Sequence, residues 1–287
     1  MKLLSFQYAG RSSWGAVIGD KVADMGRKFP QYPTLQDYIA AERLSQVQVD
    51  AASVVADIPL SSIRYLPVIL RPEKIICAIR NYHDHHREVV AAGLDRELSA
   101  FPPIFLRVWR SQTGHEAPIV RPHCSDSLDW EGELAVVIGK PGRNIPAERA
   151  HEHIAGYSIY NDASIREWQF HAKSIAAGKN FEDTGAFGPW MVTADEIAPD
   201  RPLKLETRLN GKVMQSTRTD DMIFSVAQQI EYASTIFTLV PGDVIVTGTP
   251  GGVGWSKKPP LFMVPGDVVE VEIEAIGVLR NRIVQAT

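Results

Sequence analysis

The sequence of 287 residues contains only two cysteines, Cys77 and Cys124, and neither belongs to a Cys-x-x-Cys pair. This scarcity indicates neither a disulfide framework nor a zinc site. We therefore expect two free thiols that behave as small apolar side chains.

Long apolar runs and basic clusters are also lacking. No run approaches the ~18 apolar residues that a membrane-spanning helix needs, and the N-terminus turns polar too early for a secretory signal. The net charge is −4 without a block of Lys or Arg. This argues against nucleic-acid or anionic-membrane partners, because such binding needs a clustered basic surface. We expect a cytoplasmic globular protein.

The first quarter of the chain predicts a small α+β unit over residues 1–66. A Gly19-Asp20 turn between apolar runs is a hairpin signal, and Thr34 is a suitable N-cap for a helix over residues 34–56. Pro67 and Pro72 mark the exit from this unit. Its short strands are expected at residues 3–6, 14–18 and 22–24.

The second part, residues 67–287, is rich in predicted strands. A helix is expected from Asp84 to Ala92, and two Pro-Gly-Asp-Val turns begin at Pro241 and Pro265, each launching a strand. Because β-α-β alternation is missing, we predict a β-rich α+β fold. The other expected strands are residues 74–79, 103–108, 134–138 and 153–160.

Glu131 and Glu133 begin an apolar run that continues to Ile138. Residues two apart in a strand share one face, so their carboxylates would lie together at a core boundary. That arrangement is costly unless a cation lies between them, and carboxylate oxygens suit Mg²⁺, Mn²⁺ or Ca²⁺. Asp162 is the candidate third ligand, and it lies where a helix over residues 163–169 is expected to begin. Two other interpretations stay open: a solvated edge strand for the glutamates, and an N-cap role for Asp162.

Several ordered motifs resemble the signatures of the fumarylacetoacetate hydrolase family. They cover roughly residues 70–285, and each one alone is weak, whereas together they are highly specific. The motifs are Arg80-Asn81-Tyr82-His83-Asp84-His85, the run from Asp129 to Lys140, Gly156–Asp162, Asn210-Gly211, Pro241–Ile245 and Thr247–Gly254.

This resemblance implies a catalytic domain built on a rolled, barrel-like mixed β-sheet, and a homodimer. It also implies Mg²⁺ or Mn²⁺ on Glu131, Glu133 and Asp162. The implied substrates are small 2-oxo acids with a 1,3-dicarbonyl or acylpyruvate pattern.

His85 and Glu88 lie three residues apart in the predicted helix and share a face. A carboxylate that orients an imidazole suits a general base, and the resemblance assigns the family's His-Glu dyad to these positions. A solvated surface helix is the alternative. His83 departs from the family pattern and adds a second possible base or an unproductive metal ligand.

The resemblance also places Lys179 near the metal and substrate, where its ammonium would stabilise an enolate. Arg166 and Gln169 are candidates to hold a substrate carboxylate, or else ordinary exposed helix residues. We reject a phosphate-loop interpretation of residues 248–254, because a Gly-Lys-Ser/Thr ending is missing. Substrate contacts are instead assigned to Thr249, and also to Tyr82 and Arg107.

These observations predict a metal-dependent hydrolase that cleaves a C–C bond of an acylpyruvate, such as maleylpyruvate or fumarylpyruvate, to pyruvate and a carboxylic acid. His85 and Glu88 would activate the water. One alternative keeps the site but decarboxylates or isomerises a 2-oxo dicarboxylate, or cleaves ureidoglycolate. The other is a non-catalytic protein in which the metal only stabilises the fold.

Overall fold

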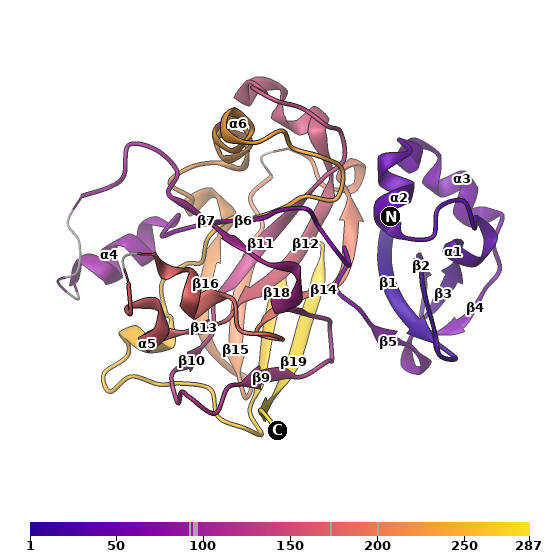
Figure 1. Ribbon diagram of the computed structural model, residues 1–287. Coiled ribbons are helices and arrows are strands. Elements are labelled where there is room, and N and C mark those ends of the chain that lie inside the picture. Colours follow the sequence, from indigo (N-terminus) through magenta and orange to yellow (C-terminus); the bar gives the residue numbers. More distant parts are fainter. Residues whose placement is uncertain (92, 94–96, 173, 200) are drawn as a thin grey trace.

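The computed structural model describes residues 1–287 except 92, 94–96, 173 and 200. Its strands form a large mixed sheet, a second sheet of five strands and one short two-stranded pairing. Figure 1 shows the N-terminal strands on one side of the molecule and the strands that carry the site in its middle. The predicted strand-rich α+β fold is confirmed.

The N-terminal strands form an antiparallel meander. The hairpin between β2 and β3 turns at Gly19 and Asp20, as predicted, and Gly19 has a φ of 62°. Strand β1 then pairs with β14, so the meander extends the large sheet. A division of the chain at residue 66 stays a prediction. The strands are β1 (Lys2–Tyr8), β2 (Arg11–Ile18), β3 (Lys21–Asp24) and β4 (Ala56–Pro59).

The helix predicted over residues 34–56 is wrong in its length. Thr34 does cap it, and forms a capping box with Asp37. The helix then ends, because Glu42 adopts a left-handed φ of 56° that a right-handed helix cannot contain. A 3₁₀ turn and a separate helix come next in the chain. The short helices of this region are α1 (Met25–Lys28), α2 (Leu35–Ala40), the 3₁₀ turn Arg43–Gln46 and α3 (Val47–Ala52).

Strands β11 and β12 lie in the interior of the large sheet and pair antiparallel. Every residue of β11 is buried, which explains its apolar sequence from Leu134 to Ile138. The sheet order is β4-β3-β2-β1-β14-β12-β11-β17-β6-β7, with β5 (Arg64–Tyr65) on β1 and β8 (Gln112–Thr113) on β14. The remaining bounds are β6 (Ile75–Ala78), β7 (Ile104–Arg107), β11 (Gly132–Ile138), β12 (Ile154–Asp162), β14 (Gly185–Thr193) and β17 (Val244–Val246).

The second sheet has the order β16-β15-β18-β19-β9. Its strand β18, like β17 of the large sheet, comes directly after one of the two predicted Pro-Gly turns. Gly242 and Gly266 adopt φ values of 87° and 100°, which favour glycine. The bounds are β9 (Ile119–Arg121), β15 (Lys204–Leu209), β16 (Lys212–Arg218), β18 (Val268–Ile273) and β19 (Gly277–Gln285).

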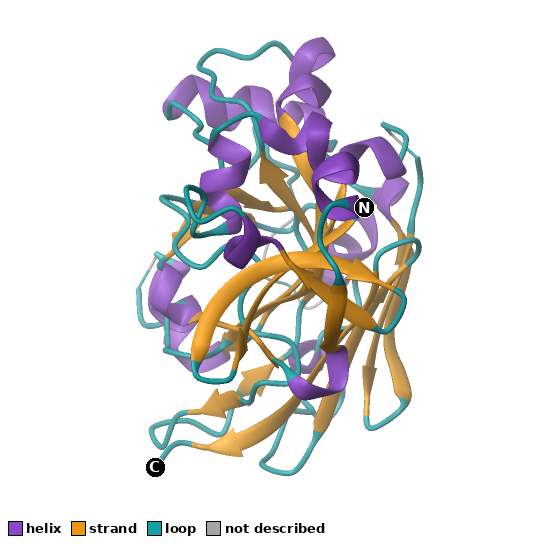
Figure 2. Ribbon diagram, turned by 90° about the vertical axis from the view of Figure 1, so that its right-hand side faces the viewer, coloured by secondary structure: helices purple, strands orange, loops and turns teal. Residues whose placement is uncertain are grey.

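The resemblance implies a barrel-like sheet, but the sheets do not close into a barrel. In the described residues the large sheet ends at β4 and β7, and the five-stranded sheet ends at β16 and β9. Figure 2 shows most of the helices gathered towards one end and strands filling the other. None of the helices in the described ranges has the length and apolar character to cross a membrane. The longest is α6 (Val226–Ile236).

Candidate active site

Three buried carboxylates meet where β11 begins and β12 ends. Glu131 immediately precedes β11, Glu133 lies within it, and Asp162 is the last residue of β12. The antiparallel pairing brings the strand ends together, and the Asp162 N–H donates to the Glu131 carbonyl at 2.8 Å. One carboxylate oxygen of each residue lies within 4.8 Å of the others. The cluster is therefore buried, which excludes a solvated edge strand.

Cations surround two of these carboxylates. The Lys179 ammonium contacts Glu131 and lies 2.6 Å from Asp162 Oδ2, while Arg166 Nη1 lies 2.6 Å from Glu131 Oε1. Arg107 donates to the other oxygen of Asp162. Burial raises the pKa of Glu131, but Lys179 and Arg166 outweigh it and lower that pKa to about 2.

Glu133 differs from its neighbours, because within the described ranges no cation lies at ion-pair distance from it. Its carboxylate accepts a hydrogen bond from the Gly248 N–H at 2.5 Å. Burial, followed by the charges of Asp162 and Glu131, raises its pKa well above the usual value. The cluster thus offers three carboxylates as hard oxygen donors, and the Glu133 carboxylate lacks a nearby cation. This donor set fits a divalent metal ion such as Mg²⁺ or Mn²⁺.

The segment after Asp162 does not begin with the helix that the sequence predicted. Ser164 and Ile165 form β13, which pairs with β10 (Leu128–Asp129), and α5 comes next as the single turn Arg166–Gln169. The N-cap of α5 is Ile165. Asp162 is therefore not an N-cap, and its side chain is left for the carboxylate cluster.

Asp129 holds the Arg166 side chain in position. Asp129 is fully buried, and its Oδ2 accepts from Arg166 Nε at 2.7 Å and from the Trp255 N–H at 2.9 Å. Its Oδ1 accepts from the Gly254 N–H at 2.7 Å. One carboxylate thus holds both the guanidinium beside Glu131 and the turn that carries Trp255.

The glycine-rich turn contacts both halves of the site. Gly248 and Gly252 have φ values of 100° and 101°, and a Cβ on Gly248 would come within 2.6 Å of Asn81 Cβ. These conformations aim the Gly248 N–H at Glu133 and the Gly252 N–H at Glu88. Thr249 Oγ1 donates to the Gly132 carbonyl at 3.1 Å. This turn is a structural support of the site.

The predicted His-Glu pair forms on helix α4 (His83–Ala91). His85 Nδ1 lies 3.1 Å from Glu88 Oε2, while the other oxygen of Glu88 accepts from Gly252 N–H at 3.0 Å and from Ser256 Oγ. Burial raises the pKa of Glu88, but these hydrogen bonds outweigh it and lower the pKa below its usual value. His83 is exposed, so His85 is the imidazole that faces the site.

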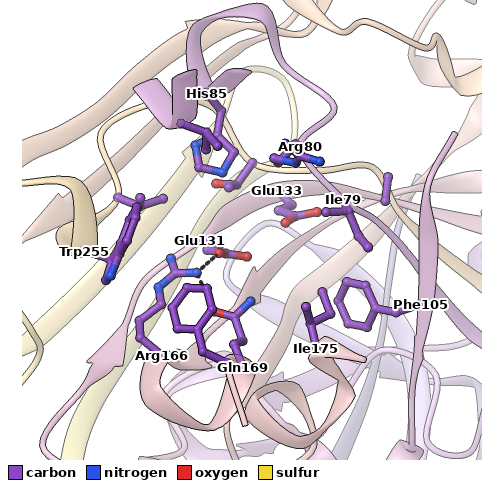
Figure 3. A pocket seen from close by; sticks show the side chains of 15 residues that line it. Ile79, Arg80, His85, Phe105, Glu131, Glu133, Arg166, Gln169, Ile175 and Trp255 are labelled. Carbon is purple, nitrogen blue, oxygen red and sulfur yellow. Dashed lines mark hydrogen bonds and ion pairs between the residues drawn. The ribbon is translucent and has the colours of Figure 1, made fainter. Parts of the chain in front are cut away.

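His85, Glu131 and Glu133 line one cavity of about 330 Å³. Figure 3 shows His85 on one side of it and Arg166 with Gln169 on the other, with Glu131 and Glu133 between them. Thr249 also lines the cavity, while its contact with a substrate stays a prediction. The remaining lining residues are Ala78, Ile79, Arg80, Val89, Phe105, Phe170, Ile175, Val253 and Trp255.

Three other predicted site residues lie behind the cavity surface. Lys179 and Arg107 are buried and contact the carboxylates. Tyr82 is also buried, and burial raises its pKa well above the usual value. Their roles towards a substrate stay predictions, and the contacts of Lys179 and Arg107 are those of residues that hold the carboxylates in place.

A family model provides the decisive comparison. The model for the fumarylacetoacetate (FAA) hydrolase C-terminal domain matches residues 74–284. The chain belongs to this family. The predicted family is therefore confirmed, and its match covers the carboxylates, the His-Glu pair and the glycine-rich turn.

Members of the fumarylacetoacetate hydrolase family with different activities resemble the chain. It is 38% identical to the mitochondrial oxaloacetate tautomerase FAHD2A of Bos taurus, over 93% of this chain and 85% of the relative. It is 41% identical to the oxaloacetate tautomerase YisK of Bacillus subtilis, over 78% and 74%. Maleylpyruvate hydrolase from Sphingobium sp. SYK-6, solved with manganese and pyruvate, is 27% identical with a TM-score of 0.82, over the full length of both chains.

Several residues that build the site carry no recognisable signal in the sequence. Asp129 lies in the same run as the two glutamates, but nothing in that run marks it as a buried anchor. Gln215 connects strand β11 to the turn, since it accepts from the Gly132 N–H at 3.0 Å and donates to Thr249 at 2.8 Å. Phe170 and Trp255 become neighbours only in the fold.

Proposed function

We propose that this protein catalyses keto–enol tautomerisation of a 2-oxo acid by moving a proton at C3, with a divalent cation on Glu131, Glu133 and Asp162. The observation that carries the proposal is the opposition of His85 and the carboxylate cluster across one cavity. An oriented imidazole facing a cation site is the arrangement that enolisation beside a carbonyl needs. The tautomerase names of two relatives support it.

The floor of the cavity suits the carboxylate of a 2-oxo acid. Arg166 Nη1 is used by Glu131 and by Gln169 Oε1, the latter at 2.9 Å. Its Nη2 is buried and has no hydrogen-bond partner among the described residues. A buried donor without a partner is costly, and a substrate carboxylate at this position would satisfy it.

The protein's own residues would carry out the proton transfer. The Glu88 carboxylate engages His85 Nδ1, which leaves Nε2 to take the proton from the enol hydroxyl and deliver one to C3, or the reverse. Lys179, Arg166 and Arg107 keep the carboxylates in place. A cation bound there would act as a Lewis acid that polarises the keto oxygen.

The test is the rate at which enol-oxaloacetate converts to the keto form, measured through the loss of enol absorbance with Mg²⁺ or Mn²⁺ present. We expect His85→Asn to lower the rate ~10²-fold or more. His83→Asn is the matched control, because His83 is exposed on the same helix, and it should leave the rate unchanged. A wild-type rate no faster than buffer with metal would refute the tautomerase. Wild-type activity in His85→Asn would refute the role of His85.

C–C bond hydrolysis of an acylpyruvate is the second candidate. It is favoured by the likeness to maleylpyruvate hydrolase and by a cavity larger than a four-carbon acid requires. In this reaction His85 would deprotonate a water instead of the substrate. Release of pyruvate from maleylpyruvate or fumarylpyruvate would distinguish hydrolysis from tautomerisation.

The cellular location and the assembly are also proposals. We keep the cytoplasmic location and the homodimer as predictions, although the bovine relative is a mitochondrial protein. The expected partner is a small 2-oxo acid.

A further inference from the structure

The cavity divides into a polar floor and an apolar remainder. Glu131, Glu133 and Arg166 form the floor, and His85 faces them from α4. Away from the floor, Ile79, Phe105 and Ile175 lie together on one side (Figure 3); we call these three residues the apolar wall. All three line the cavity and are half-buried, so part of each side chain is uncovered. The apolar wall is therefore available to a ligand.

The opposite side of the cavity carries two aromatic rings. Trp255 lies across from the apolar wall (Figure 3), and its ring centroid is 6.0 Å from that of Phe170. Phe170 is 60% exposed although it lines the cavity. A large apolar side chain left exposed at a cavity is informative, whereas an isolated one elsewhere is not. We call Phe170 and Trp255 the aromatic pair.

The volume of the cavity agrees with an occupant larger than oxaloacetate. Its 330 Å³ lies within the range of about 300–1,000 Å³ typical of pockets for larger ligands. A second carboxylate placed between the apolar wall and the aromatic pair would lose most of its water, because the indole N–H of Trp255 is the one hydrogen-bond donor among these five side chains. An uncharged ring or branched chain would lose nothing by the same transfer.

We propose that the preferred substrate is a 2-oxo acid whose far end is a bulky, uncharged apolar group, such as an aryl ring, held between the apolar wall and the aromatic pair. This inference rests on the proposed function for its 2-oxo acid end. It adds the chemical class of the distal group. Arg80 lines the cavity beside His85 (Figure 3), so capture of a distal carboxylate by Arg80 is the opposing outcome.

The experiment measures binding of three non-reacting 2-oxo acid analogues by calorimetry with Mn²⁺ present. Oxamate carries no distal group, N-oxalylglycine carries a distal carboxylate, and N-phenyloxamate carries an aryl ring. We expect N-phenyloxamate to bind about tenfold or more tightly than the other two, as burial of an apolar group of that size allows. Phe170→Ala should remove most of this advantage.

Phe101→Ala is the matched control, because Phe101 is 64% exposed and does not line the cavity. It should bind all three analogues as the wild type does. Tightest binding of N-oxalylglycine, with weakening in Arg80→Ala, would overturn the proposal. So would equal affinity for the three analogues, or no binding of any of them.

The outcomes separate this inference from the proposed function. If N-phenyloxamate is preferred but neither tautomerisation nor exchange at C3 occurs, the proposed function fails and the ligand class stands. If oxaloacetate turns over rapidly while N-oxalylglycine is preferred, the ligand class fails and the proposed function stands.

Discussion

Replacement of Asp129 by asparagine should destabilise the protein strongly without touching the metal ligands. Asp129 is fully buried and accepts four hydrogen bonds, from Arg166 Nε and from the N–H groups of Trp130, Gly254 and Trp255 at 2.7–2.9 Å. An asparagine oxygen can replace one carboxylate oxygen. The NH₂ group of the asparagine would then face two hydrogen-bond donors, from which it cannot accept. Glu131 would be the remaining ion-pair partner of Arg166 among the described residues.

The magnitude can be worked out from the loss of a buried ion pair. Removal of one partner of such a pair costs ~3–5 kcal/mol. Because Arg166 keeps its contact with Glu131 at 2.6 Å, we expect the lower end, about 3 kcal/mol. For a chain of this size that corresponds to a decrease in Tm of roughly 6–12 °C. Differential scanning calorimetry at neutral pH with excess chelator measures it without a contribution from bound metal.

Asp126→Asn is the matched control. Asp126 also forms an ion pair, with Arg121 at 3.0 Å, but its side chain is 93% exposed. Pairs at the surface contribute little, so the Tm of this variant should stay within about 2 °C of the wild type. If Asp129→Asn unfolds within the same 2 °C, the idea that Asp129 anchors Arg166 and the Trp255 turn is wrong.

Two further predictions concern pH and metal. The pKa of Glu88 is lower in the folded protein, so its ionised form stabilises the fold above its usual pKa and this contribution is lost as pH falls through the folded value. Glu88→Gln should therefore be less stable than the wild type near pH 7, with a difference that shrinks below about pH 4 in calorimetric melts. A constant difference would contradict this. Mn²⁺ at ~100 Kd should raise the free energy of unfolding of the chelator-treated protein by about 2.7 kcal/mol, and Glu133→Gln should abolish this stabilisation. Equal stabilisation of the wild type and the variant would exclude Glu133 as a metal ligand.

The carboxylate cluster could be predicted because its information is local. Glu131 and Glu133 lie two residues apart before a buried strand, and Asp162 ends the strand that pairs with it. Only the family resemblance, however, separated a metal site from an N-cap at Asp162. The structure provides the physical reason, since β13 occupies the positions at which a helix was expected.

The rest of the site depends on contacts between distant segments. Arg107 pairs with Asp162 from 55 residues away, and Gly252 reaches Glu88 across 164 residues. No pattern within either segment specifies its partner. The break of the predicted helix at Glu42 was equally hidden, because a glutamate gives no sequence signal for a left-handed conformation.

Solvent exchange at C3 of a 2-oxo acid tests the central claim most directly. 2-Oxobutyrate in D₂O with Mg²⁺ would be monitored by proton NMR through loss of its C3 methylene signal. Proton transfer by His85 predicts rapid exchange with the wild type and with His83→Asn, and an exchange rate ~10²-fold lower with His85→Asn. Wild-type exchange equal to that of Mg²⁺ in buffer, or undiminished exchange with His85→Asn, would contradict proton transfer by His85 at this site.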